Sequence, residues 1–142
     1  MKEVVVEQKF RAPICKIWEA LTNLEEMKQW YFDNIDSFRA EVGAKSRFEV
    51  QSGERTFTHL WVVTKVVPFE CIQYNWKYAE YPGDSLVTFD LKKDGNETLL
   101  VLTATFIEDF PGEIPEFKRE SCVAGWQYFI QGRLKTYLEL NC

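Results

Sequence analysis

The chain has 142 residues, a formal net charge of −5 and 46% hydrophobic residues, with aromatic residues alone making up 15%. A composition this apolar excludes a disordered chain, and the length suits a single domain over residues 1–142. The acidic balance, without a concentrated basic segment, argues against nucleic acid as a partner.

The amino-terminal residues alternate charged and apolar side chains, which predicts a strand over residues 2–11 and no signal peptide. No run reaches the ~20 apolar residues of a membrane helix, so we expect no membrane span and a cytoplasmic location. The four cysteines form no CxxC pair, and His59 is the only histidine. We therefore expect reduced thiols, no metal site and no other cofactor.

Two short helices are predicted after this strand. Pro13 suits the first position of a helix, and apolar residues follow it at helical spacing: Ile14, Ile17, Trp18 and Leu21. Thr22 and Glu25 have the spacing of a capping box, which predicts the start of a second short helix. Its buried face would hold Leu24, Met27 and Trp30.

The apolar period changes to two between residues 34 and 107, and turn residues such as Asp94-Gly95 recur at short intervals. This pattern predicts six further strands, near 35–41, 45–51, 56–67, 71–79, 85–93 and 98–107. Together with the first strand they would form a seven-stranded antiparallel sheet.

A long helix is predicted at the end of the chain, because no proline lies between Arg119 and Leu140. Apolar residues recur there at intervals of three and four: Val123, Trp126, Phe129, Ile130, Leu134, Tyr137 and Leu138. The predicted fold is therefore α+β, with a curved seven-stranded sheet wrapped around a long C-terminal helix. The two short helices would close one end.

Alternation within the strands identifies an inward face rich in aromatic residues. In the strand at 71–79, Tyr74 and Trp76 share a face that is free of charged residues, so this row must point inward. We expect an apolar pocket between this face and the last helix, lined by Phe48, His59, Trp61, Tyr74, Trp76, Phe89, Trp126 and Ile130. Close packing against the helix would explain most of the same rings.

His59 is the one imidazole on these strands. It would contact a ligand or act as a base, or it is an ordinary strand histidine. No carboxylate at a recognisable spacing would orient it, so no catalytic residue is assigned. The segment 110–117 would be a lid over the pocket or a simple connection folded onto the sheet edge.

Several ordered segments carry a family resemblance. They are Arg11-Ala12-Pro13 with Trp18, Ala20, Leu21 and Thr22; Trp30; Val67-Pro68 with Ile72, Tyr74, Asn75 and Trp76; Val87, Phe89 and Leu91; Glu97-Thr98 with Leu100 and Leu102; and Gly125-Trp126 with Leu134, Tyr137 and Leu138. This set resembles the activator-of-Hsp90-ATPase-like (AHSA1-like) branch of the START-like (SRPBCC, helix-grip) superfamily. Two positions depart from it: Gly43-Ala44 replaces the usual Gly-Gly, and Trp61 stands where glycine is common. An inward Trp61 would fill pocket volume.

The resemblance implies a helix-grip fold, whose members bind lipids, sterols or polyketides, cyclise or hydrolyse them, or stimulate a chaperone. The leading hypothesis is a non-enzymatic protein that binds a small hydrophobic molecule. One alternative is a chaperone-associated interaction module similar to the Hsp90 ATPase activator, which would have a filled cavity. Another is a cyclase or hydrolase, which needs at least two polar groups converging in the cavity.

Overall fold

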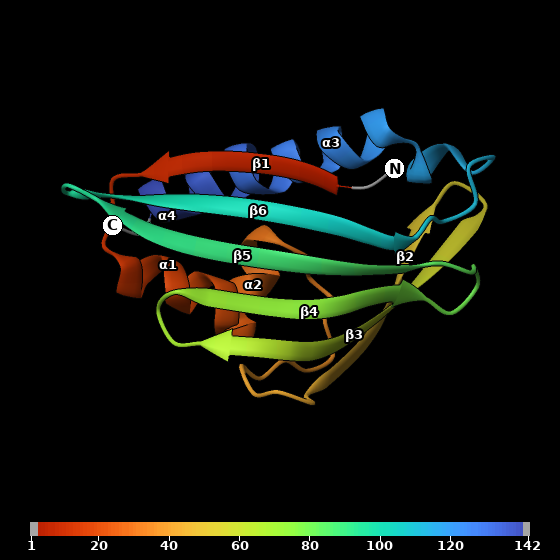
Figure 1. The fold of residues 1–142 in the computed structure, drawn as a ribbon, viewed down its shortest axis with the longest axis horizontal. Coiled ribbons are helices and arrows are strands. Elements are labelled where there is room, and N and C mark those ends of the chain that lie inside the picture. The colour runs from red at the N-terminus through yellow and green to blue at the C-terminus, as the bar shows by residue number, and fades with distance from the viewer. Residues whose placement is uncertain (1–2, 141–142) are drawn as a thin grey trace.

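The computed structural model describes residues 3–140 and contains a six-stranded antiparallel sheet with the helices on one side of it (Figure 1). The elements in chain order are β1 (Glu3–Phe10), α1 (Ile14–Thr22), α2 (Leu24–Trp30), β2 (Lys45–Ser52), β3 (Arg55–Val67), β4 (Cys71–Tyr78), β5 (Asp84–Asp94), β6 (Glu97–Glu108), η1 (Pro115–Phe117), α3 (Arg119–Gln127), η2 (Tyr128–Leu134) and α4 (Lys135–Leu140).

The strand order in the sheet is β1-β6-β5-β4-β3-β2, so all neighbours except β1 and β6 are consecutive in the chain. The hairpin expected at Asp94-Gly95 is confirmed, with Asp94 paired to Glu97 and Gly95 at a φ of 63°. β1 and β2 are the two edges, and the sheet is curved but open. The predicted antiparallel sheet is therefore confirmed, but the prediction of a seventh strand is wrong.

The segment predicted as that strand, 35–41, is an irregular connection. Its buried residues, Ile35 and Phe38, are three apart and do not alternate. Asp36 Oδ1 accepts hydrogen bonds from the backbone N–H groups of Ser37 and Arg47, at 2.8 and 2.9 Å. Side-chain bonds of this kind compete with a strand ladder, so they hold the segment beside β2 without adding a strand.

The start of α2 also differs from the prediction. Asn23 is the N-cap, and its side-chain oxygen accepts a hydrogen bond from the backbone N–H of Glu26 at 3.2 Å. The Thr22 hydroxyl instead donates to the carbonyl of Trp18, one turn back in α1. The predicted capping box is therefore wrong by one residue, since asparagine is an equally good cap.

The C-terminal helix runs from Arg119 to Leu140 as α3, η2 and α4, as predicted, but its middle section η2 has π-helical geometry. Its inward stripe is Trp126, Ile130, Leu134 and Leu138, each at most 8% exposed. Two of its exposed side chains reach the rest of the molecule: Gln131 donates to the carbonyl of Glu7, and Arg133 to that of Gln29. The helix is thereby fixed to β1 and to α2.

The short helices fill one end of the space between the sheet and the C-terminal helix. Met27 and Trp30 of α2 are fully buried, and the Trp30 indole N–H donates to the carbonyl of Ala20 at 2.8 Å. Next to them, the hydroxyl groups of Tyr31 and Tyr74 form a buried hydrogen bond of 2.8 Å. This end of the molecule is therefore a packed aromatic core.

Replacing Tyr74 by phenylalanine should lower the free energy of unfolding by about 1–3 kcal/mol, because the buried hydroxyl of Tyr31 would lose its partner. The double variant Tyr31→Phe/Tyr74→Phe should recover part of that loss, since neither hydroxyl is then left alone. Urea denaturation of the two single variants and the double variant would measure the coupling. Additive losses would mean that the two hydroxyls do not interact.

Two further observations concern the described residues as a whole. None of the helices within residues 3–140 is long and apolar enough to cross a membrane. Cys15, Cys71 and Cys122 are free thiols, while Cys142 lies outside the described residues.

Candidate functional site

A cavity of about 370 Å³ lies between the sheet, α3 and the connection from β6 to α3. Most of its wall is aromatic or aliphatic. It is lined by Phe32, Val50, Ser52, Phe57, His59, Trp76, Tyr78, Ser85, Val87, Ala104, Phe106, Phe110, Glu116, Phe117, Ser121, Cys122, Gly125, Trp126 and Phe129.

The strand register places the sheet residues around the cavity next to one another at one end of the sheet. Phe48 pairs with His59, which pairs with Tyr78, and Trp76 pairs with Ser85. Because residues in register point to the same face, these side chains form adjoining rows across β2 to β5. The rows at the opposite end are covered by α2 and Tyr31, so on this face of the sheet the cavity lies at the uncovered end.

The connection from β6 to α3 forms another wall of the cavity. Phe110 and Phe117 lie on it, and their ring centroids are 5.1 Å apart. Phe110 packs on Gly83 so closely that a Cβ added to this glycine would lie 2.2 Å from its ring. The segment 110–117 therefore contributes side chains to the wall of the cavity.

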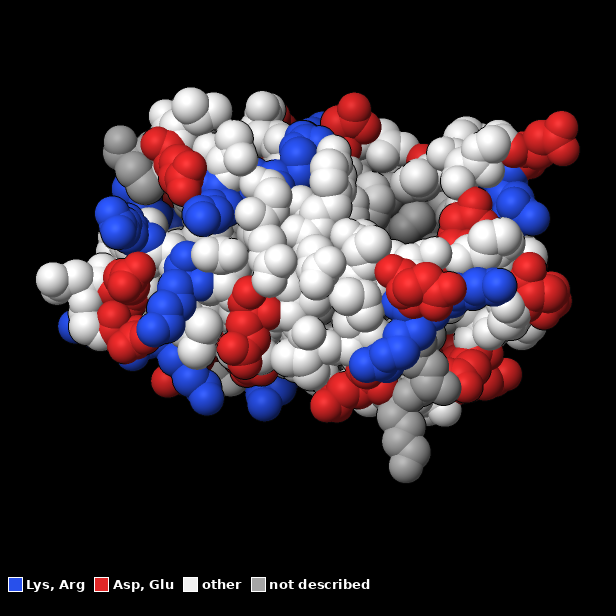
Figure 2. Space-filling model, turned by 90° about the horizontal axis from the view of Figure 1, so that it is seen from above, with Lys and Arg blue, Asp and Glu red and all other residues white. Residues whose placement is uncertain are grey.

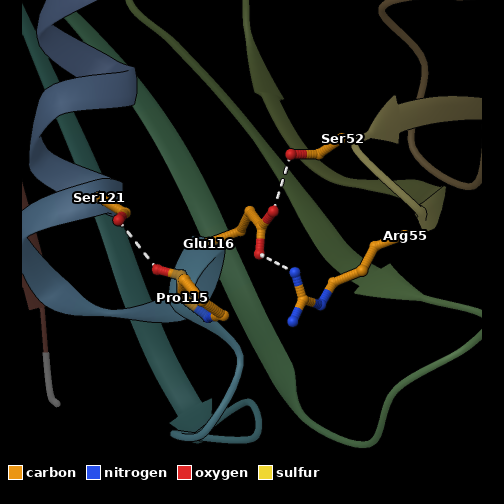
Figure 3. A network of polar contacts seen from close by, with 5 residues as sticks. All are labelled: Ser52, Arg55, Pro115, Glu116 and Ser121. Carbon is orange, nitrogen blue, oxygen red and sulfur yellow. Dashed lines mark hydrogen bonds and ion pairs between the residues drawn. The ribbon is translucent and has the colours of Figure 1, made fainter.

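A polar network joins this segment to the β2–β3 hairpin (Figure 3). Glu116 on η1 points across to the hairpin, where the Ser52 hydroxyl donates to its Oε2 at 2.7 Å. Arg55 Nη1 lies 3.7 Å from Oε1, and the Ser121 hydroxyl at the start of α3 donates to the carbonyl of Pro115. The hydrogen bond from Ser52 holds the pKa of Glu116 below its ordinary value, so the carboxylate is ionised at neutral pH.

His59 is a buried polar residue of the cavity wall and is only 5% exposed. Its ring stacks on Phe48, with centroids 4.7 Å apart, and Tyr78 meets it edge-on at 4.9 Å. Nδ1 lies 3.0 Å from the carbonyl oxygen of Phe57. Burial lowers the pKa of His59 to about 4, so the ring is neutral at neutral pH.

The titratable groups of the wall are poorly suited to proton transfer near pH 7. An imidazole with so low a pKa is a weak base near pH 7, and its partner is a carbonyl, not a carboxylate. The thiol of Cys122 also lines the cavity, and burial raises its pKa, which keeps it protonated. Within residues 3–140, no group of three histidine, cysteine, aspartate or glutamate side chains is placed to hold a metal ion.

The structure separates the predicted pocket residues into two groups. His59, Trp76 and Trp126 line the cavity. The rest are buried in the adjoining core and do not line it: Phe48, Trp61, Tyr74, Phe89 and Ile130. Trp61 points inward and is 1% exposed, so it occupies space that a glycine would have left open.

Sequence reasoning missed several residues of the wall, among them Phe32, Phe106 and Gly125. Phe106 carries the same inward alternation as Leu102 and Ala104, so the signal was present. What alternation leaves open is which end of the inward face the short helices cover. Phe32 lies two residues after the end of α2 and gave no periodic signal.

The surface seen from above in Figure 2 has a central strip of uncharged residues. Basic and acidic side chains are interspersed around it, with neither sign forming a continuous field on this face.

Comparison with known proteins identifies the family. The model of the activator of Hsp90 ATPase homolog 1-like protein family matches residues 11–139. Comparison with curated proteins gives no match.

Solved structures with the same fold include the following. DynU16, a putative protein in the dynemicin biosynthetic locus, is 25% identical with a TM-score of 0.77; the match covers 99% of this chain and 48% of that one, so this chain spans about half its length. MLL2253 from Mesorhizobium loti is 24% identical with a TM-score of 0.79, covering 99% of both chains. The Aha1 dimer from Colwellia psychrerythraea is 23% identical with a TM-score of 0.69, covering 98% of this chain and 97% of that one. With a family match over nearly its whole length, the chain belongs to the activator of Hsp90 ATPase homolog 1-like family.

Proposed function

We propose that this protein binds a small hydrophobic molecule in the cavity between its sheet and its C-terminal helix. The observation that carries the proposal is an unfilled space of about 370 Å³ whose wall is mostly aromatic. Ligand pockets typically begin at about 300 Å³ and combine apolar walls with a few polar groups. His59, Trp76 and Trp126 are the predicted ligand contacts that lie on this wall.

The open cavity also helps to choose among the alternative functions. A chaperone-associated module was expected to have a filled cavity, and the open one supports the ligand instead. The likeness to the Aha1 dimer, at 23% identity, supports the fold alone. A cyclase or hydrolase needs an effective base, and a His59 with a pKa near 4 is a poor one. A cytoplasmic location stays a prediction.

The expected affinity is modest for a small probe. A bicyclic aromatic molecule that buried roughly 250 Å² of apolar area would gain about 6 kcal/mol, which corresponds to a Kd on the order of 10–100 μM. Titrations with 2-naphthol, laurate and a sterol should therefore extend to several hundred micromolar where solubility allows. Trp76 and Trp126 line the cavity, so tryptophan emission would report the binding of laurate or a sterol. Calorimetry would report the binding of 2-naphthol, which itself absorbs and emits in the tryptophan range.

Gly125→Leu should weaken the binding of such a probe at least tenfold without destabilising the fold. Gly125 lines the cavity from α3, and a Cβ there meets nothing within 4 Å, so a leucine side chain would enter the free space. Replacing a helical glycine should also add about 0.5–1 kcal/mol to the free energy of unfolding. Calorimetric titration and thermal unfolding of the variant would measure both effects.

Gly132→Leu is the matched control. Gly132 lies on the same helix, but it is absent from the wall of this cavity, and its Cβ would come no closer than 4.0 Å to Gln127 O. This variant should bind the probe like the natural protein. Unchanged binding by Gly125→Leu would place the ligand elsewhere, and no binding of any probe to the natural protein would refute the proposal.

A further inference from the structure

The serine hydroxyl groups of the cavity wall already donate hydrogen bonds within the protein. The Ser52 hydroxyl donates to Glu116, that of Ser85 to the carbonyl of Trp76 at 2.8 Å, and that of Ser121 to the carbonyl of Pro115 at 2.9 Å. A serine hydroxyl has a single hydrogen to donate. These three residues therefore have no hydrogen left for a ligand.

The tautomer of His59 follows from its partner. The Phe57 carbonyl can only accept a hydrogen bond, so Nδ1, 3.0 Å away, must carry the hydrogen. In a neutral ring the other nitrogen, Nε2, then has a free lone pair and is an acceptor. No hydrogen bond to Nε2 is found among the described residues, and the ring lines the cavity.

Four aromatic rings fix the position of this acceptor. Phe48 stacks on the imidazole, and Phe32, Trp76 and Tyr78 surround it at centroid distances of 5.0, 5.2 and 4.9 Å. A ring held on several sides cannot swing to find another partner. Tyr78 also lines the cavity, and burial raises its pKa, so its phenol keeps the hydrogen. A neutral Tyr78 therefore adds no negative charge to this wall.

The charged residues in the cavity wall disfavour an anionic ligand. Glu116 is its ionised residue, and no lysine or arginine belongs to the lining within residues 3–140. Arg55 lies against Glu116 and is not part of the lining. An anion in the cavity would lose its water, gain no cation and lie near a carboxylate, which is unfavourable.

We infer that the cavity selects uncharged aromatic ligands that carry a hydroxyl group, with the ligand O–H donating to Nε2 of His59, and that it disfavours carboxylates. This inference rests on the proposed function and adds the chemical class of the ligand. A phenol matches the wall because its O–H fits the acceptor and because it is uncharged near neutral pH. Its fused rings would lie among Trp76, Trp126 and Phe129.

Three probes of the same ring system test this inference at pH 7.5: 2-naphthol, 2-methoxynaphthalene, which keeps the oxygen but has no hydrogen to donate, and anionic 2-naphthoate. The natural protein should bind 2-naphthol about tenfold more tightly than 2-methoxynaphthalene, as expected for one net hydrogen bond. It should bind 2-naphthoate the most weakly of the three. His59→Phe should reduce the tenfold preference to about one, while Thr64→Val, an exposed change on the same strand, should keep it.

A second measurement needs no variant. Because His59 is the only histidine, its nitrogen-15 signals are unambiguous. The Nε2 signal should shift clearly on adding 2-naphthol and much less on adding 2-methoxynaphthalene. If 2-methoxynaphthalene binds as tightly as 2-naphthol, if the Nε2 signal stays unmoved, or if 2-naphthoate binds best, the inference on ligand class is overturned while the proposed function stands. Failure of every probe to bind would instead refute the proposed function.

Discussion

Trp61→Ala should lower the free energy of unfolding by about 3–5 kcal/mol, the range expected when a fully buried aromatic residue is truncated. The indole is 1% exposed and contacts six aromatic rings, those of Tyr31, Phe32, Phe38, Phe48, Tyr74 and Trp76. Neighbours from both the sheet and the helical side cannot all collapse into the gap, so most of the lost volume would remain empty. Denaturant unfolding followed by circular dichroism would measure the loss.

Trp61→Phe should cost less than half as much. The indole Nε1 of Trp61 is buried without a hydrogen-bond partner, so phenylalanine would remove an unsatisfied donor while keeping a ring among its neighbours. Leu60→Ala, a change at the partly buried position on the opposite face of β3, serves as the control, with an expected loss of about 1 kcal/mol. If Trp61→Ala lost less stability than Leu60→Ala, Trp61 would not be the centre of the aromatic core.

The stability of the protein should fall by about 3 kcal/mol between pH 6.5 and pH 4 through His59 alone. Burial lowers its pKa from 6.5 to about 4 in the folded state. Between these values the unfolded chain binds a proton that the folded one does not, so stability declines as the pH falls. Well above pH 6.5 the imidazole is neutral in both states, and its contribution to the pH dependence ends there.

Comparing the natural protein with His59→Phe isolates this effect. Carboxylates titrate in the same range in both proteins, so their contribution cancels in the difference between the two pH profiles. Urea unfolding at pH 7, 5.5 and 4.5 should give a steeper decline for the natural protein. Parallel profiles would mean that His59 is protonated in the folded state without penalty.

Strand alternation and helical spacing were sufficient to predict most of this fold. Asp94-Gly95 between alternating runs predicted the β5–β6 hairpin, and the row of Tyr74 and Trp76 correctly indicated the inward face of β4. The segment 35–41 could not be read in this way, because Asp36 binds backbone groups of its neighbours and of β2. Side-chain bonds to distant backbone leave no periodic trace in a sequence.

The cavity was harder to locate than the fold. Tyr74 and Phe89 have the same sequence signature as Trp76, yet Tyr31 covers them, through a hydrogen bond to Tyr74 and an edge contact with Phe89 at 6.4 Å. Where the space remains depends on how the short helices dock, and this is a tertiary property. Gly125 gave no signal either, since a glycine in a helix marks free space only once its surroundings are known.

The π-helical section of the C-terminal helix explains how Trp126, Ile130, Leu134 and Leu138 can form one straight stripe. In an α-helix with about 3.6 residues per turn, each step of four residues overshoots a full turn by about 40°, so the stripe would wind away from the sheet. A π-helical turn, with i→i+5 hydrogen bonds, is wider and undershoots instead, which cancels the drift. The π-helical section therefore accommodates one residue more than an α-helix would place between Trp126 and Leu138. With one residue removed there, eleven α-helical steps of about 100° would come to about 1100°, within about 20° of three full turns, and Leu138 would still face the sheet.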